Sequence, residues 1–245
     1  MRSRTTRRSS KPTPARSDEQ SASARQAIRL RKRMRFFEPG AVRVKICGIT
    51  TEADARMCIA AGTDALGFNF YRGSKRYLDP LTAIPWIQKL DESIDRVAVV
   101  VNPEEELLET IRAAGCFDAV QFHGDETPGF CEWAGMARWI KAVRIRSAEA
   151  MEAALAFDTP NLLFDAWLEG AYGGTGLRLD WDAVRDFVIG VRDRRFILAG
   201  GLTVHNVRQA IRIVRPHGVD VAGGVELVPG KKEEYLVREF IKSVR

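Results

Sequence analysis

The sequence predicts an α/β protein: a single-domain (β/α)8 barrel of the TIM-barrel class, preceded by a disordered basic N-terminal extension. From residue 42 onward, short runs rich in Val, Ile, Leu and Phe alternate with helical stretches, and eight such runs occur. The runs are mostly apolar rather than alternating, which is typical of parallel strands buried on both faces. The chain has 245 residues, a length that such barrels reach as one domain.

Eight strands are expected in the body of the chain. They are predicted at 42–47, 65–70, 96–101, 119–123, 139–145, 161–166, 196–200 and 219–223. An open doubly wound sheet is the structural alternative, but the first strand–helix turn lacks the G-x-G-x-x-G sequence of dinucleotide-binding folds. We therefore expect a barrel that forms the catalytic domain and spans residues 42–245.

Capping residues indicate the helices between the strands. Thr51 precedes a helix with an acidic first turn, and Gly62 ends it. Pro103 is expected at the first position of another helix, which Gly115 closes. Further helices are predicted to begin after Ser147, Asp180, Thr203 and Glu233.

The first 35 residues form a strongly basic extension. They hold ten Arg and two Lys against Asp18 and Glu19, a net charge of +10, whereas the whole chain carries +6. The remaining residues therefore carry a net charge of −4, and we expect no nucleic-acid binding by the barrel. Residues 1 to about 25 are too polar to form a core and are expected to be disordered, and 26–35 to form at most a short basic helix.

Three interpretations of this extension stay open. It fits an arm that binds nucleic acid or an anionic surface, and its Arg- and Ser-rich composition also fits an organelle transit peptide. It also fits a dispensable extension, with Met34 as the actual start.

The composition does not indicate a membrane, secretory or metal-binding protein. No apolar run reaches the roughly 18 residues of a spanning helix, and no apolar signal region opens the chain. The cysteines form no C-x-x-C pair and lie at no metal-ligand spacing to a histidine; they are Cys47, Cys58, Cys116 and Cys131. We expect reduced thiols, a cytoplasmic location, no metal, no membrane partner, and a monomer or homodimer.

Two glycine pairs predict a phosphate site, because active sites of such barrels lie at the carboxyl ends of the strands. Gly200-Gly201 and Gly223-Gly224 follow the seventh and eighth strands, where backbone amides commonly bind a phosphate. The segment YGGTG at 172–176 would add amides. Alternatively, these glycines only form tight turns. Two pairs on adjacent strands favour a small phosphorylated substrate.

Cys47 ends the first strand and Asp165 ends the sixth, which suggests an acid–base pair. A thiolate there can remove a proton from carbon, and a carboxylic acid can donate one to oxygen. Burial would keep the acid protonated, and Lys45, on the same side of its strand as Cys47, would favour the thiolate. Alternatively, Cys47 is a small buried apolar residue, as we expect for the other three cysteines.

Two further polar residues are expected at the site. Arg76, in the segment SKRY after the second strand, is a candidate to bind an anionic group. His123 ends the fourth strand and is interpreted as a ligand contact rather than a base.

Several stretches together resemble the phosphoribosylanthranilate isomerase family of tryptophan biosynthesis. They are KICGIT, GFNFYRGSKRYLDP, VQFHGDE, LLFDA followed by GGTGLRLDW, ILAGGLTVHNVRQAI and GVDVAGGVELVPGKK, in family order over residues 43–232. The resemblance implies a (β/α)8 barrel that catalyses an Amadori rearrangement. N-(5-phosphoribosyl)anthranilate would become 1-(o-carboxyphenylamino)-1-deoxyribulose 5-phosphate, with no metal or organic cofactor.

The resemblance also implies roles for single residues. Asp165 matches the general acid that protonates the ribose ring oxygen and opens the ring to a Schiff base. Cys47 matches the general base that removes the proton from C2′. Arg76 matches the arginine that contacts the anthranilate end of the substrate, and His123 and Asp220 match further substrate contacts.

The chain departs from the family pattern at three positions. Two serines are usual where this chain has Ala222 and Gly223, so two hydroxyl groups are missing while the backbone amides remain. A lost hydrogen bond to a charged group is worth about 1.5–3 kcal/mol, so phosphate affinity is expected to fall somewhat. Glu233 replaces a common Asp, which we expect to be harmless.

Other functions stay open at this point. A barrel isomerase of histidine synthesis would typically use two carboxylates, near the ends of strands 1 and 5, and Cys47 argues against it. An enzyme with two substrates and a nucleic-acid-associated protein acting through the basic extension are the further alternatives.

Overall fold

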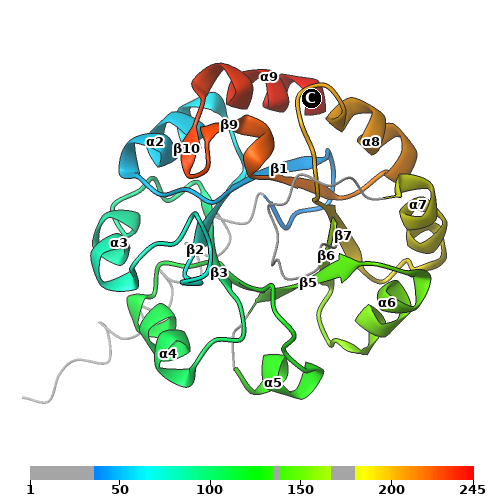
Figure 1. The fold of residues 1–245 in the computed structure, drawn as a ribbon, viewed down its shortest axis with the longest axis horizontal. Coiled ribbons are helices and arrows are strands. Elements are labelled where there is room, and N and C mark those ends of the chain that lie inside the picture. Colours follow the sequence, from blue (N-terminus) through cyan, green and yellow to red (C-terminus); the bar gives the residue numbers. More distant parts are fainter. Residues whose placement is uncertain (1–35, 135–137, 167–179) are drawn as a thin grey trace, which may run out of the picture. The chain divides into compact units, whose positions relative to one another are not determined.

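A computed structural model describes residues 36–134, 138–166 and 180–245. Its strands form a closed parallel barrel in chain order, with the last strand paired to the first (Figure 1). The strands are β1 (Arg43–Cys47), β2 (Ala65–Asn69), β3 (Asp95–Val100), β4 (Ala119–Phe122), β5 (Trp139–Ile145), β6 (Asn161–Ala166), β7 (Arg195–Leu198) and β8 (Gly218–Val221). The predicted barrel is confirmed, with each boundary within two residues, and the open-sheet alternative is wrong.

Helices surround the ring of strands (Figure 1). They are α2 (Glu52–Ala61), α3 (Pro80–Ile87), α4 (Glu105–Ala114), α5 (Pro128–Trp133), α6 (Ala148–Ala153), α7 (Trp181–Gly190), α8 (Val207–Val214) and α9 (Glu234–Val244). Short 3-10 segments lie at η1 (Ala154–Ala156) and η2 (Gly223–Val225), and β9 (Glu226–Val228) pairs with β10 (Lys231–Lys232). Among the described residues, no helix is long and apolar enough to cross a bilayer.

Most predicted caps are confirmed. The Thr51 side chain accepts from the Asp54 amide at the start of α2, and Gly62 ends that helix in the left-handed conformation. Asp180 caps α7 and Glu233 caps α9 through their side chains. The sequence therefore determines these helix ends locally.

Two predicted helix starts are wrong. Pro103 lies before the helix, because Asn102 adopts φ 43° and α4 begins only at Glu105. The helix expected directly after Thr203 begins later, at Val207, because the Asn206 side chain accepts from the Thr203 amide and holds a turn there. The Asn206 side chain thus stabilises a local turn that competes with the helix, whereas the turn at Asn102 is held by Asp125 and Glu126 in the loop after β4.

The N-terminal end of the barrel is closed by Phe36 and Phe37. Phe36 is 3% exposed and packs with the apolar side chains inside the barrel. Its amide donates to Asp95 Oδ2 at 2.8 Å, and the two phenyl rings meet edge to face at 5.3 Å between centroids. These residues therefore belong to the packed barrel, although the expected boundaries left them unassigned. The basic extension expected at 1–35 and the segment 172–176 lie outside the described residues.

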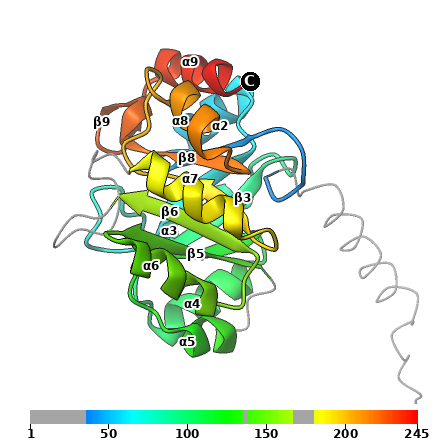
Figure 2. The same ribbon diagram turned by 90° about the vertical axis from the view of Figure 1, so that its right-hand side faces the viewer.

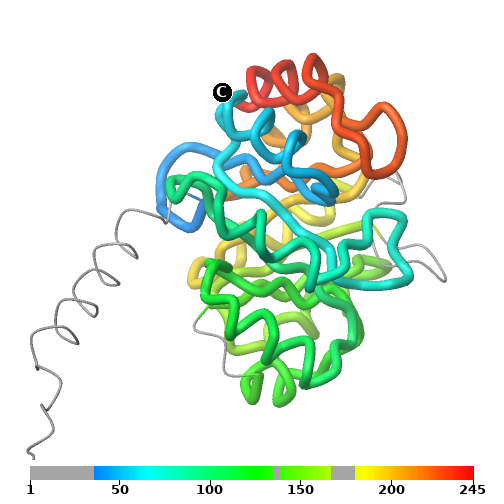
Figure 3. The backbone as a smooth tube through the Cα atoms, turned by 90° about the vertical axis from the view of Figure 1, so that its left-hand side faces the viewer, coloured from blue at the N-terminus to red at the C-terminus, as the bar shows by residue number. Residues whose placement is uncertain are grey.

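The two ends of the barrel differ. The β9–β10 hairpin and the segment after β2 lie at one end in both side views, and the segment before β1 lies at the other (Figures 2 and 3). The carboxyl ends of all eight parallel strands face the first of these ends. This is the end at which the sequence predicts chemistry.

Replacing Phe36 by Ala tests the closure of the barrel. The variant leaves a cavity among buried side chains, so the free energy of unfolding is expected to fall by about 3–5 kcal/mol. Urea denaturation measures it, with Leu81→Ala as the control, because Leu81 is 78% exposed. A loss below about 1 kcal/mol for Phe36→Ala would show that the ring is not part of the core.

Candidate active site

The carboxyl ends of the strands surround a cavity of about 350 Å³. Its lining includes the predicted acid and base, the predicted substrate contacts and both glycine pairs, whereas 172–176 lies outside the described residues. The predicted residues that line the cavity are Cys47, Arg76, His123, Asp165, Gly200, Gly201, Asp220, Gly223 and Gly224. Barrel closure thus brings together side chains that lie far apart in the sequence.

Lys45 and Asp220 form a buried ion pair beside the cavity. They are register partners on β1 and β8, with 2.9 Å between Nζ and Oδ1, and Lys45 is fully buried. Burial alone disfavours the ammonium group, but the Asp220 carboxylate and then Cys47 outweigh it and raise the pKa of Lys45. Asp220, expected as a substrate contact, is therefore engaged by Lys45 while it also lines the cavity.

Cys47 is the last residue of β1 and is partly exposed to the cavity. The thiol still lies deep in the barrel, and burial raises its pKa above the usual value. Lys45 and Lys232 act in the opposite direction, and Asp220 adds to the rise. Lys45 therefore favours the thiolate, as the sequence suggested, but burial outweighs it.

Asp165 is the second-last residue of β6, lines the cavity and is 5% exposed. Its Oδ1 accepts from the Ala166 amide at 2.8 Å, and its Oδ2 lies 3.2 Å from His123 Nε2. The other ring nitrogen of His123 lies 2.9 Å from the Gln121 side-chain nitrogen. When the Gln121 amide donates to Nδ1, the ring hydrogen is on Nε2 and points at the carboxylate.

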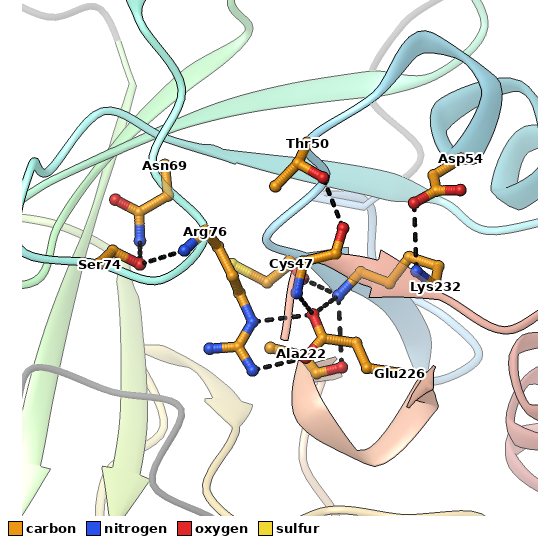
Figure 4. A network of polar contacts seen from close by, with 10 residues as sticks. Cys47, Thr50, Asp54, Asn69, Ser74, Arg76, Ala222, Glu226 and Lys232 are labelled. Carbon is orange, nitrogen blue, oxygen red and sulfur yellow. Dashed lines mark hydrogen bonds and ion pairs between the residues drawn. The ribbon is translucent and has the colours of Figure 1, made fainter. Parts of the chain in front are cut away.

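Arg76 reaches the cavity from the segment after β2 and points toward Glu226 (Figure 4). Gly48 has φ 75°, and a β-carbon there would overlap the Arg76 side chain. The glycine after Cys47 therefore serves two purposes, a left-handed turn and space for the arginine. The guanidinium forms two hydrogen bonds to Glu226, with 2.8 Å between Nε and Oε1 and 2.6 Å between Nη2 and Oε2.

The glycine pairs combine turn formation with close packing of the two loops. Gly200 and Gly201 adopt φ 80° and 65°, so side chains there would be strained. A β-carbon at Gly224 would overlap the Leu202 carbonyl group, which brings the loops after β7 and β8 together. Both pairs line the cavity, where their backbone can face a ligand.

Three charged residues of this region were missed by the sequence analysis. Glu226 and Lys232 lie 2.7 Å apart at the cavity end of the barrel. Glu126 accepts from the Gly124 amide directly after His123 at 3.0 Å, and pairs with Lys141 on β5. Position alone was a partial signal, because Glu126 and Glu226 lie in the loops that follow β4 and β8 at the barrel mouth; their partners could not be read from the sequence.

Within the described part of the chain, no group of three His, Cys, Asp or Glu side chains is arranged to hold a metal ion. The cavity instead offers a thiol, carboxyl groups, an arginine and backbone amides. This set can bind an anion and move protons.

Known proteins are similar to this chain in sequence and in fold. Residues 44–243 match the family model described as N-(5'phosphoribosyl)anthranilate (PRA) isomerase. A curated relative from Trichlorobacter lovleyi, named N-(5'-phosphoribosyl)anthranilate isomerase, is 41% identical over 204 residues, which cover 83% of this chain and 98% of the relative.

Two solved structures are also similar, each with 38% identity, a TM-score of 0.73, and coverage of 83% of this chain and 98% of the other. One shows monomers of the dimeric phosphoribosylanthranilate isomerase from Thermotoga maritima. The other is a phosphoribosylanthranilate isomerase in complex with reduced 1-(o-carboxyphenylamino)-1-deoxyribulose 5-phosphate. The chain belongs to the N-(5'-phosphoribosyl)anthranilate isomerase family.

Proposed function

We propose that this chain isomerises N-(5'-phosphoribosyl)anthranilate to 1-(o-carboxyphenylamino)-1-deoxyribulose 5-phosphate in tryptophan biosynthesis. The observation that carries the proposal is the meeting of Cys47 and Asp165 with two glycine pairs at one cavity. Family membership over residues 44–243 supports the same substrate. A cavity of about 350 Å³ is in the size range of small-molecule sites.

Binding uses the two ends of the substrate. The phosphate lies on the backbone amides of the glycine pairs after β7 and β8. Because Ala222 and Gly223 carry no hydroxyl group, these amides supply the contacts there. The anthranilate carboxylate pairs with Arg76, whose guanidinium Glu226 holds beside the cavity.

The reaction proceeds by a series of proton transfers. Asp165 donates a proton to the ribose ring oxygen, the C1′–O bond breaks, and the nitrogen lone pair forms the protonated Schiff base. The Cys47 thiolate then removes the proton from C2′, and the electron pair forms the enolamine. In the tautomerisation C1′ gains a proton and the C2′ hydroxyl group loses one, which gives the ketone. Loss of a proton from the Cys47 thiol and return of one to Asp165 restore the starting states, so the isomerisation consumes no cofactor. His123 orients the acid through its hydrogen bond to Asp165.

We propose a monomer or a homodimer as the active assembly. The relative from Thermotoga maritima is described as dimeric. Each barrel of this chain brings its own Cys47 and Asp165 to one cavity, so the acid and the base come from the same chain in either assembly.

Removing the acid or the base tests the mechanism. Cys47→Ser and Asp165→Asn are expected to lower kcat by about 10²-fold or more, the scale of a lost general acid or base. The fluorescence decay of freshly generated phosphoribosylanthranilate measures turnover. Cys58→Ala and Asp182→Asn serve as controls, since neither residue lines the cavity, and a chain beginning at Met34 should remain active. Point variants at Cys47 or Asp165 that keep more than about a tenth of wild-type activity would contradict the roles.

Burial of the Cys47 thiol should also affect the pH dependence of kcat/KM. A base must be deprotonated, so a raised pKa of Cys47 moves the rising limb of kcat/KM to higher pH. Alkylation of Cys47 by iodoacetamide reports the thiolate directly, and its half-maximal rate is expected above about pH 8.5, the value of a free thiol. Mass spectrometry follows the modification, with Cys47→Ser as the blank. A midpoint well below that pH would show that the cations outweigh burial.

A further inference from the structure

We infer that Glu226 is a positioning residue of this site, whose single buried carboxylate holds Arg76 at the substrate and Lys232 beside Cys47 at the same time. The part that concerns Arg76 rests on the proposed function. The part that concerns Cys47 does not depend on the identity of the substrate. The residues concerned are shown in Figure 4.

The Arg76–Glu226 contact fixes the direction of the guanidinium. Both carboxylate oxygens accept, at 2.8 and 2.6 Å, and the side chains are 12% and 3% exposed. These hydrogen bonds raise the pKa of Arg76. Two parallel bonds hold a planar guanidinium in one orientation, so Glu226 determines which edge of Arg76 remains for a substrate carboxylate.

Lys232 binds the same carboxylate and also the backbone of Cys47. Its Nζ lies 2.7 Å from Glu226 Oε1, and it donates to the Cys47 carbonyl oxygen at 2.6 Å and to the Ala222 carbonyl oxygen at 3.3 Å. The ammonium group is fully buried among these oxygens. Lys232 therefore ties the β9–β10 hairpin to the end of β1, where the thiol is.

The hairpin that carries these residues is itself anchored. The Gly230 amide donates to Glu226 Oε1 at 3.3 Å, which folds the hairpin over the carboxylate. The Lys232 amide donates to Asp54 Oδ2 in α2 at 3.1 Å. Glu226 thus has a defined position from which to hold both cations.

The balance of charges around Cys47 depends on the carboxylate of Glu226. The charged groups that act on Cys47 are Lys45 and Asp220 from β1 and β8, Lys232 from β10, and Arg76 from the segment after β2. Glu226 from β9 is the shared counter-ion of Arg76 and Lys232. The charges of Lys45 and Asp220 cancel. Arg76 and Lys232 against Glu226 leave one excess positive charge, which either the thiolate or a substrate carboxylate can balance.

The carboxylate of Glu226 is ionised at neutral pH. Burial alone would raise its pKa, but Arg76 and then Lys232 outweigh burial, and the pKa of Glu226 lies below its usual value. Burial lowers the pKa of Lys232, while Glu226 and Cys47 oppose this. Neutralising Glu226 would leave Arg76 and Lys232 without their shared counter-ion, which favours an anion at Cys47 or at the substrate position.

Three variants test this inference. Glu226→Gln removes the charge, so alkylation of Cys47 by iodoacetamide at neutral pH is expected to rise by about threefold or more, where tenfold corresponds to one unit of pKa. Lys232→Gln removes a cation, so the alkylation rate should fall by a similar factor. Glu226→Asp keeps the charge but shortens the reach to Arg76, so alkylation should change little while KM rises about tenfold with kcat less affected.

Glu234→Gln is the matched control, because Glu234 lies in the first turn of α9, is 57% exposed and pairs only with Arg238 among the described ion pairs. It should alter neither readout. Unchanged alkylation in both Glu226→Gln and Lys232→Gln would overturn the inference. If Glu226→Gln does not fold, as judged by circular dichroism, the difference between Lys232→Gln and Glu226→Asp decides.

The two measurements separate the inference from the proposed function. Suppose that the alkylation rate shifts in Glu226→Gln and Lys232→Gln while KM is unchanged in Glu226→Asp. That result would overturn the positioning of Arg76 and leave the effect on Cys47 standing. Wild type that shows no turnover, together with the expected alkylation shifts, would overturn the proposed substrate while supporting the electrostatic role of Glu226.

Discussion

The buried ion pair between Lys45 and Asp220 is the interaction on which the site depends. The two residues sit opposite each other on the first and last strands, so they meet only when the barrel closes in this register. A buried ion left without its partner costs about 3–5 kcal/mol, which penalises any other register at this seam. The same closure places Cys47 at the tip of β1 beside the Asp220 carboxylate, and so couples the fold to the position of the base.

Around this pair, the barrel mouth combines a buried base with nearly balanced charge. Burial makes the Cys47 thiolate harder to form, and Lys45 and Lys232 offset part of that effect. A thiolate formed under these conditions is a stronger base than one with a low pKa. Glu226 keeps Lys232 and Arg76 from over-stabilising it. The outcome is a base that remains reactive and an arginine that remains available to an anion.

Sequence patterns predicted most of the fold and part of the site. Buried parallel strands are apolar runs, so eight of them could be placed within two residues, and Cys47 stood out because it ends one. The helix start predicted at Pro103 was wrong, because the turn at Asn102 depends on partners in the loop after β4. Glu226 was missed because its contact with Arg76 joins residues 150 positions apart. The β9–β10 hairpin that carries Glu226 has no periodic sequence pattern from which it could be predicted. Such contacts exist only after the barrel has closed.

The central claim is that Cys47, Asp165, Arg76 and the two glycine pairs, which line one cavity, act on one substrate. A crystal structure of this chain with reduced 1-(o-carboxyphenylamino)-1-deoxyribulose 5-phosphate would test it most directly. We expect the phosphate on the amides of the two glycine pairs, the carboxylate paired with Arg76, and the ribulose carbons between Cys47 and Asp165. A phosphate bound elsewhere, or a sugar chain beyond hydrogen-bond reach of both Cys47 and Asp165, would contradict the account.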